Sequence, residues 1–140
     1  LAAKEGVTLE NNSNLAAKAA SGSARFDGYV ICPASGTTIG KIAAGISDNL
    51  ATRSALVAMK ERRKLIIVPR EAPYSTPHLK AMFNLSEWGA VILPASPGFY
   101  QSPRNIEDLI DFVVARILDQ LDVDHTLGKR WTGEEVPSED

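Results

Sequence analysis

Three short, continuous apolar runs divide the chain: G-Y-V-I-C-P from Gly28, K-L-I-I-V-P from Lys64 and A-V-I-L-P from Ala90. Runs of this length and composition are typical of strands that are buried on both faces of a parallel sheet. Helical patterns of about ten to fifteen residues separate the runs, so right-handed crossovers are expected to connect the strands. The sequence therefore predicts an α/β protein with a three-layer fold built on a mainly parallel sheet.

The segments around these runs carry helix signals. Helices are predicted over 15–20, 38–46, 50–63 and 78–88. Polar residues at 47–49 and at 75–76 offer N-caps for the last two of these helices. A longer helix is predicted to open at Ser102-Pro103, because apolar residues then recur at the spacing of one helix face. These residues are Ile106, Leu109, Ile110, Val113, Val114, Ile117, Leu118 and Leu121.

Composition limits the classes of function. A chain of 140 residues with 44% hydrophobic content can bury a core, and residues 1–131 are expected to form one domain before a mobile acidic tail at 132–140. A net charge of -2 and a pI near 5.7 argue against a nucleic-acid partner. The single cysteine, Cys32, is expected to be a small core residue, and no metal site is expected. Since no bilayer-length apolar run or signal peptide is recognised, no membrane partner and a cytoplasmic location are expected.

The stretch from Arg53 to Glu71 concentrates cations around a predicted strand. Arg53 and Lys60 are seven residues apart, so both side chains should project from one face of a helix, where an anion could bind. Arg70 and Glu71 follow the strand and place a fixed cation and a titratable carboxylate at its carboxyl end. The alternative is that Lys60 and its neighbours at 62–63 are solvated cations at a helix C-terminus.

A second polar loop, Ala34 to Thr38, follows the first apolar run. Ser35, Gly36, Thr37 and Thr38 are small or carry hydroxyl groups, so their N–H and O–H donors could hold a phosphate or a ring carbonyl. An ordinary Ser/Thr N-cap is the alternative. The two histidines, at 78 and 125, lack the spacing of a metal pair and are expected at surface or capping positions, without a catalytic role.

Four motifs occur in a familiar order. They are C-P-A-S-G-T-T at 32–38, K-E-R-R-K-L-I-I-V-P-R-E-A-P at 60–73, G-A-V-I-L-P-A-S-P-G-F-Y at 89–100 and D-F-V-V-A-R-I-L-D at 111–119. Together they resemble the UbiX-type flavin prenyltransferases over residues 21–131. This resemblance implies a Rossmann or flavodoxin-like fold, and an enzyme that transfers a prenyl group from dimethylallyl monophosphate to reduced FMN.

The resemblance also implies roles for individual residues. The loop 35–38 and Arg70 match positions that contact FMN. Glu71 matches the catalytic acid residue, and Lys60 is expected to be catalytic as well as to bind the substrate. The positions that match the rest of the active site, mainly around the prenyl phosphate, are Lys60, Tyr100, Arg116, Arg53 and Trp131. In the family, the site lies where subunits of a dodecamer meet, and the prenylated FMN serves UbiD-type decarboxylases. The family begins with a strand and a Gly/Ser-rich loop, and we expect this segment to be missing here.

Two alternatives remain open. FMN-dependent decarboxylases of cysteine-containing substrates share the fold group, but they carry asparagine where this chain has Thr37. A non-catalytic FMN-binding subunit is the second alternative. Such a subunit would have no need to keep Lys60, Glu71, Tyr100 and Arg116 together.

Overall fold

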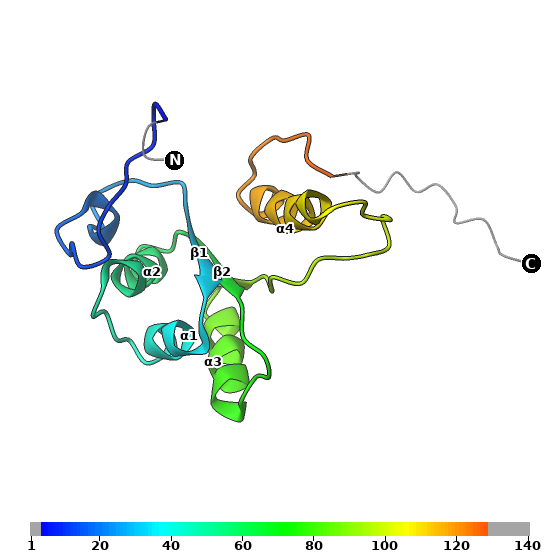
Figure 1. The fold of residues 1–140 in the computed structure, drawn as a ribbon. Coiled ribbons are helices and arrows are strands. Elements are labelled where there is room, and N and C mark those ends of the chain that lie inside the picture. The colour runs from blue at the N-terminus through cyan, green and yellow to red at the C-terminus, as the bar shows by residue number, and fades with distance from the viewer. Residues whose placement is uncertain (1–3, 129–140) are drawn as a thin grey trace, which may run out of the picture. The chain divides into compact units, whose positions relative to one another are not determined.

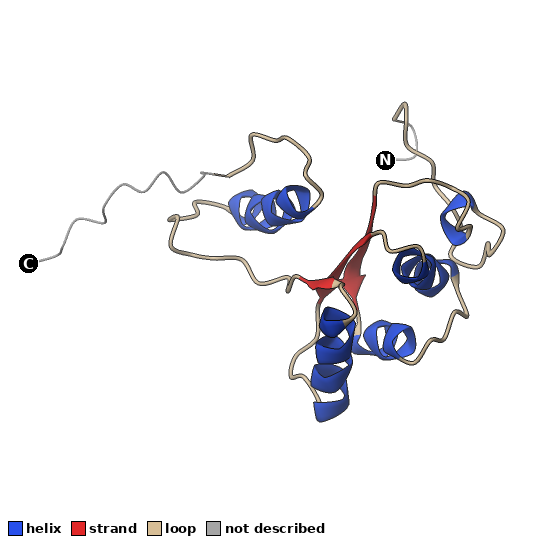
Figure 2. Cartoon of the chain, turned by 180° about the vertical axis from the view of Figure 1, so that it is seen from behind, coloured by secondary structure: helices blue, strands red, loops and turns tan. Residues whose placement is uncertain are grey.

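The computed structural model describes residues 4–128, which divide into two units on either side of the Ala95–Ser96 bond. The first unit contains a short 3-10 helix, three strands and three α-helices, and the second contains one α-helix (Figures 1 and 2). In chain order these elements are η1 (Lys18–Ala20), β1 (Gly28–Ala34), α1 (Gly36–Ala43), α2 (Leu50–Lys60), β2 (Lys64–Pro69), α3 (Thr76–Glu87), β3 (Val91–Ile92) and α4 (Ile106–Gln120).

The three strands form one parallel sheet in the order β1-β2-β3, which confirms the predicted α/β class. Tyr29 pairs with Leu65, and Ile66 pairs with Val91. The third strand is shorter than predicted. Its pairing nevertheless extends past Ile92, because the Leu93 N–H donates to the Ile67 carbonyl at 2.9 Å.

One face of the sheet packs against α1, α2 and α3. Leu65 and Ile67 of β2 belong to a single core cluster with Ile39 of α1, Ala58 of α2 and Leu85 of α3. Right-handed crossovers between consecutive neighbouring strands place all connecting helices on the same face. The first unit therefore supplies two of the three predicted layers, the sheet and one layer of helices.

Replacing the central core residue tests this arrangement. Ile67 is fully buried, so Ile67→Ala is expected to lower the free energy of unfolding by about 2–5 kcal/mol. The measurement is a urea titration at one fixed protein concentration. Ile46 is 45% exposed, and Ile46→Ala is the matched control with an expected change within about 0.5 kcal/mol. Equal losses for the two variants would contradict the burial described here.

Local capping explains where the helices begin. The side chains of Ser35, Asn49, Ser75 and Asn105 accept backbone N–H groups at the starts of α1 to α4. The predicted caps at 47–49 and 75–76 are thus confirmed. The fourth helix starts after Asn105 rather than at Ser102-Pro103, because Asn105 provides the cap in an extended conformation.

Left-handed residues explain where two helices end. Gly45 has φ of 73° after α1, and the Ile46 N–H donates back to the Lys41 carbonyl, so α1 stops at Ala43 rather than at Ile46. Arg62 has φ of 55° after α2, which ends at Lys60 rather than at Arg63. The predicted helix over 15–20 is only the 3-10 turn η1.

Cys32 is not the core residue that the sequence predicts. Its thiol is free and exposed. The pairing of β1 with β2 shifts register between Ile31 and Ala34, so the regular in-and-out alternation of side chains is interrupted at this point. Pro33 also has no N–H for the strand ladder.

The second unit presents α4 with the predicted apolar stripe, but the stripe is not fully covered. Ile106 and Ile110 are 70% and 54% exposed, and Ala115 is the buried residue of the helix. No helix in residues 4–128 combines the length and apolar character needed to cross a bilayer. The predicted tail at 132–140 lies outside the described residues.

Candidate functional site

Two polar loops meet at the carboxyl edge of β1 and β2. The Arg70 N–H donates to the Ala34 carbonyl at 3.0 Å, and the Gly36 N–H donates to Glu71 Oε2 at 3.1 Å. Glu71 is partly buried and Arg70 is exposed. The sequence predicts the loop at 34–38 and the Arg70-Glu71 pair each at the end of a strand, and the structure brings the two together.

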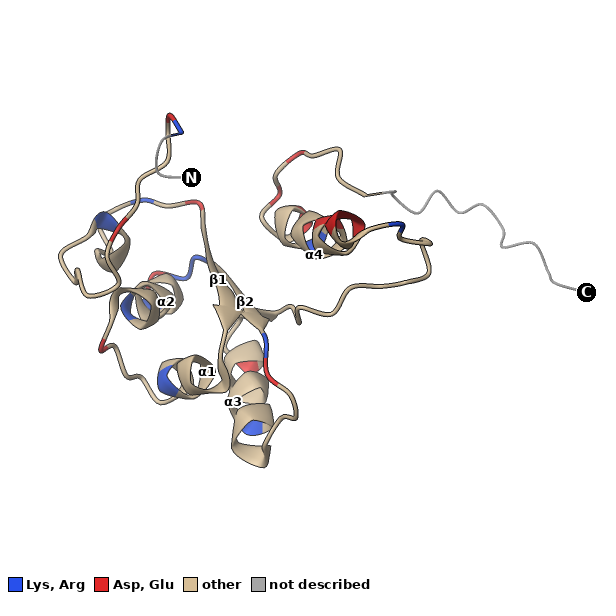
Figure 3. Ribbon diagram, in the orientation of Figure 1, with Lys and Arg blue, Asp and Glu red and all other residues tan. Residues whose placement is uncertain are grey.

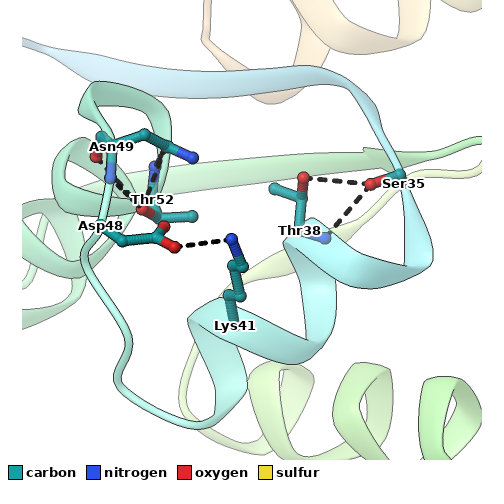
Figure 4. Close-up of polar contacts among 6 residues, drawn as sticks. All are labelled: Ser35, Thr38, Lys41, Asp48, Asn49 and Thr52. Atoms are coloured by element: carbon teal, nitrogen blue, oxygen red, sulfur yellow. Dashed lines mark hydrogen bonds and ion pairs between the residues drawn. The ribbon is translucent and has the colours of Figure 1, made fainter. Parts of the chain in front are cut away.

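The hydroxyl groups of the first loop also serve the helix that follows. Ser35 Oγ accepts the Thr38 N–H at 3.2 Å and lies 3.1 Å from Thr38 Oγ1 (Figure 4). The N-cap alternative for this loop is thus correct for Ser35. Thr37 is exposed and Gly36 is buried. Ser35 Oγ makes two of these contacts, but a hydroxyl group can donate one hydrogen bond and accept two, and Thr37 takes no part in the capping, so capping does not exhaust the loop.

Polar contacts fix the connection between α1 and α2 behind this loop. Lys41 Nζ lies 2.6 Å from Asp48 Oδ2, and the hydrogen bond from Lys41 lowers the pKa of Asp48 (Figure 4). Asn49 and Thr52 form a reciprocal capping box at the start of α2. These contacts stabilise the start of α2, the helix that carries Arg53 and Lys60.

Arg53 and Lys60 face the same segment, as predicted for one side of a helix. Arg53 Nε donates to the Ala20 carbonyl at 3.4 Å, and Lys60 Nζ lies 3.1 Å from the place that a side-chain carbon on Gly22 would occupy. Lys60 Nζ also pairs with Glu61 Oε1 at 2.8 Å. This hydrogen bond lowers the pKa of Glu61.

Arg63 is not the solvated cation that the sequence suggests. Its Nη2 donates to the Gly22 carbonyl at 2.7 Å, and its Nη1 donates to the Ala24 carbonyl and to the Tyr29 hydroxyl. Arg63 therefore fixes the segment that Arg53 and Lys60 face. The acceptors are mainly backbone carbonyls distant in sequence, so no sequence signal could have identified this role.

Lys60 and the Arg70-Glu71 pair lie at opposite ends of β2. Lys60 precedes the strand and Glu71 follows it, and a strand of this length spans about 17–20 Å. Charged segments flank β2 on both sides in Figure 3. The structure thus assembles two separate parts of the predicted site within one chain, and it does not bring Lys60 to Glu71.

The second unit holds Tyr100 and Arg116. Tyr100 is 70% exposed and packs edge-on against Phe112, with ring centroids 5.9 Å apart. Arg116 Nη1 donates to Asp119 Oδ2 at 2.8 Å. A cavity of about 490 Å³ in this unit is lined by Gly98, Phe112 and other residues, but neither Tyr100 nor Arg116 lines it.

Two further expectations concern metals and the C-terminal aromatic residue. Residues 4–128 contain no group of three or more His, Cys, Asp or Glu side chains that could hold a metal ion. Trp131 lies outside the described residues.

Comparisons with known proteins identify the group. The flavoprotein family model matches residues 4–118. A flavin prenyltransferase UbiX from Thermoplasma acidophilum is 56% identical over 120 residues, which cover 86% of this chain and 67% of the relative. The chain belongs to the flavoprotein family, in its UbiX-type group.

Two solved structures of UbiX-type proteins share the fold. A dodecameric FMN-dependent UbiX-like decarboxylase from Escherichia coli O157:H7 has 44% identity and a TM-score of 0.85, over 89% of this chain and 67% of the other. AnUbiX (PadA1), in complex with FMN and dimethylallyl pyrophosphate, has 44% identity and a TM-score of 0.86, over 90% and 67%. The predicted flavodoxin-like fold is therefore confirmed. The chain spans 58–67% of the length of the first two curated UbiX relatives.

Proposed function

We propose that this UbiX-type chain belongs to a flavin prenyltransferase, which transfers a dimethylallyl group from dimethylallyl monophosphate to reduced FMN and releases phosphate. The observation that carries the proposal is the hydrogen bond from Gly36 to Glu71. It joins the hydroxyl-rich loop after β1 to the Arg70-Glu71 pair after β2, at the edge of a parallel sheet where ligands bind. The shared names of the curated relatives support the same activity.

The donor groups at this edge fit FMN. The hydroxyl groups of Ser35, Thr37 and Thr38 and the exposed guanidinium of Arg70 can donate hydrogen bonds to the carbonyl oxygens of a flavin ring. When bound, reduced FMN supplies the electron-rich ring atoms that become bonded to the dimethylallyl group as the allylic C–O bond breaks. We assign the loop 35–38 and Arg70 to holding this ring.

The leaving phosphate needs positive charge. Negative charge grows on its oxygens as the C–O bond breaks, so cations and O–H donors directed at them stabilise the transition state. We assign this role to Lys60, Arg116 and the Tyr100 hydroxyl. Arg53 adds positive charge beside Lys60, since both side chains face the segment 20–22. Lys60 is already paired with the carboxylate of Glu61, and Arg116 with that of Asp119. The phosphate would replace both carboxylates.

Glu71 and Trp131 have different proposed roles. Glu71 exchanges a proton with the phosphate or the flavin as the new bonds form, because it combines partial burial with a position beside the flavin loop. Trp131 shelters the positively charged prenyl group by π contact and helps to exclude water.

The complete site is proposed to combine residues from more than one copy of the chain. Lys60 and Glu71 lie at opposite ends of β2, so a second copy would have to bring its Lys60 to the Glu71 edge. A homo-oligomer such as the dodecamer of the E. coli relative would supply that copy. The prenylated FMN would then pass to a UbiD-type decarboxylase.

Two organisational proposals follow. The family model crosses the Ala95–Ser96 bond, which supports residues 1–131 as one flavoprotein domain. The second proposal is a cytoplasmic location, because the exposed, free thiol of Cys32 fits the reducing conditions of the cytoplasm.

The test is an anaerobic incubation of the full-length oligomer with reduced FMN and dimethylallyl monophosphate, or with the diphosphate in a parallel reaction. A flavin heavier by one prenyl unit in mass spectrometry is the expected product. FMN binding without a heavier flavin would instead favour a binding-only subunit. Release of carbon dioxide from a cysteine-containing substrate would favour an FMN-dependent decarboxylase, the activity by which the E. coli relative is named.

The ion pair at Lys60 predicts a change in donor affinity. The phosphate must take Lys60 from Glu61, whose carboxylate lies 2.8 Å from Nζ. Glu61→Gln removes the competing charge, so the KM for the prenyl donor is expected to fall about two- to threefold with kcat unchanged. Steady-state kinetics at low salt measure this change. A higher KM in the variant would show that Glu61 assists donor binding.

A further inference from the structure

His78 occupies the third position of α3 and caps the helix with one edge of its ring. The Ser75 N–H donates to His78 Nδ1 at 3.3 Å, and the Ser75 Oγ accepts the His78 N–H at 3.4 Å. The capping position predicted from the sequence is therefore correct, but it accounts for only half of the ring.

The other edge of the ring lies against Gly36 in the loop after β1. A side-chain carbon added at Gly36 would come within 2.3 Å of His78 Nε2 and 2.5 Å of Cε1, closer than atoms can approach. Gly36 is not among the residues with positive φ, so its backbone conformation does not require glycine. The imidazole ring itself fills the space that a side chain at position 36 would need.

Gly36 is also the residue that holds Glu71. Its N–H donates to Glu71 Oε2, while the His78 ring lies over its α-carbon. Gly36 is the first residue of α1, and Ser35 caps that helix from the preceding position. A shift of the start of α1 toward α3 would therefore meet the ring, and a shift away from Glu71 would lengthen the hydrogen bond that Gly36 donates.

We propose that His78 is a positioning residue for Glu71 and acts through Gly36. The His78 ring holds the first turn of α1 in the position from which the Gly36 N–H donates to the Glu71 carboxylate. This inference rests on the proposed function, since it concerns the role of Glu71 in prenyl transfer. It gives His78 a part in the reaction beyond the capping of α3.

The first variant separates capping from positioning. His78→Gln keeps a side-chain oxygen that can complete the capping box with Ser75, but it removes the ring over Gly36. We expect the thermal midpoint to stay close to that of the wild type, kcat for prenyl transfer to fall about tenfold and the KM for the donor to stay unchanged. A wild-type kcat in this variant would show that His78 serves only as a helix cap, and would overturn the proposal.

The second set of variants tests the contact itself without turnover. Gly36→Ala should weaken FMN binding about tenfold or more, because the methyl group displaces the ring or the loop. In a His78→Ala background, Gly36→Ala should leave FMN affinity almost unchanged, because the ring no longer occupies the space of the added methyl group. Gly40→Ala is the matched control in the same helix, since a side-chain carbon there meets no atom within 4 Å. It should leave FMN affinity unchanged.

The outcomes distinguish this inference from the proposed function. Equal losses from Gly36→Ala with and without His78 would show that the ring is not the obstacle, and would overturn the inference. If the wild type binds FMN but forms no prenylated flavin, the proposed function fails together with the assigned role of Glu71 in prenyl transfer. The coupling between positions 36 and 78 would still appear in the FMN titrations, so the two failures give different results.

Discussion

Glu71→Gln should bind FMN about as tightly as the wild type and lose prenyl transfer by about 10²–10⁴-fold in kcat. Glutamine has the length of glutamate and an oxygen that can still accept the Gly36 N–H, so the loop after β1 should keep its position. It cannot exchange a proton at neutral pH. The loss of activity would therefore report the missing proton transfer, because the substitution leaves the arrangement of the two loops unchanged.

Single-turnover kinetics with reduced FMN, followed by mass spectrometry of the flavin, measure this effect. Glu87→Gln is the matched control, because Glu87 is exposed at the end of α3 and lies outside the proposed site. It should keep the wild-type rate. If Glu71→Gln retained more than a tenth of kcat, another group would have to move the proton.

A mixture of two inactive variants should recover activity. Lys60→Ala and Glu71→Gln each remove one end of the proposed site, and the two positions are separated by β2 within a chain. If each site takes Lys60 from one copy and Glu71 from another, random co-assembly restores about a quarter of the sites. Each variant assembled alone should show less than about one hundredth of the wild-type rate.

The experiment requires dissociation and reassembly of the two variants at equal concentration, followed by the anaerobic assay. Mixing Lys60→Ala with the double variant is the control, because no chain in that mixture carries Lys60. Activity in the first mixture alone would support a shared site. If the first mixture were as inactive as its components, the two residues would have to act within one chain, and the proposed assembly would be wrong.

Local patterns predicted much of the fold. The apolar runs identified all three strands, and the residues at 47–49 and 75–76 identified two helix starts, because strand burial and capping depend on neighbouring residues. The meeting of the two polar loops was also predictable. Neighbouring parallel strands deliver their carboxyl ends to one edge, so Gly36 and Glu71 could be expected to lie close together.

Other features depend on contacts that have no sequence signal. Arg63 binds backbone carbonyls at Gly22 and Ala24, which any residue could present. Cys32 is exposed because the ladder shifts register beside it, and an apolar run does not reveal such a shift. The packing of His78 on Gly36 joins the first turns of two helices, at positions 42 residues apart in the sequence.

The separation of Lys60 from Glu71 is a different case. The sequence alone showed that a strand lies between them, and the length of a strand was enough to keep them apart. The resemblance to oligomeric enzymes was needed to interpret that distance as a feature of a shared site.

The order of the strands in the sheet has a consequence for biosynthesis. The strands stand in the order in which a ribosome makes them, and each new strand pairs with the one made just before it. The nascent chain can therefore extend its sheet at one edge, closing a single helical crossover at every step. β2 and β3 therefore each emerge when the strand they pair with has already been translated.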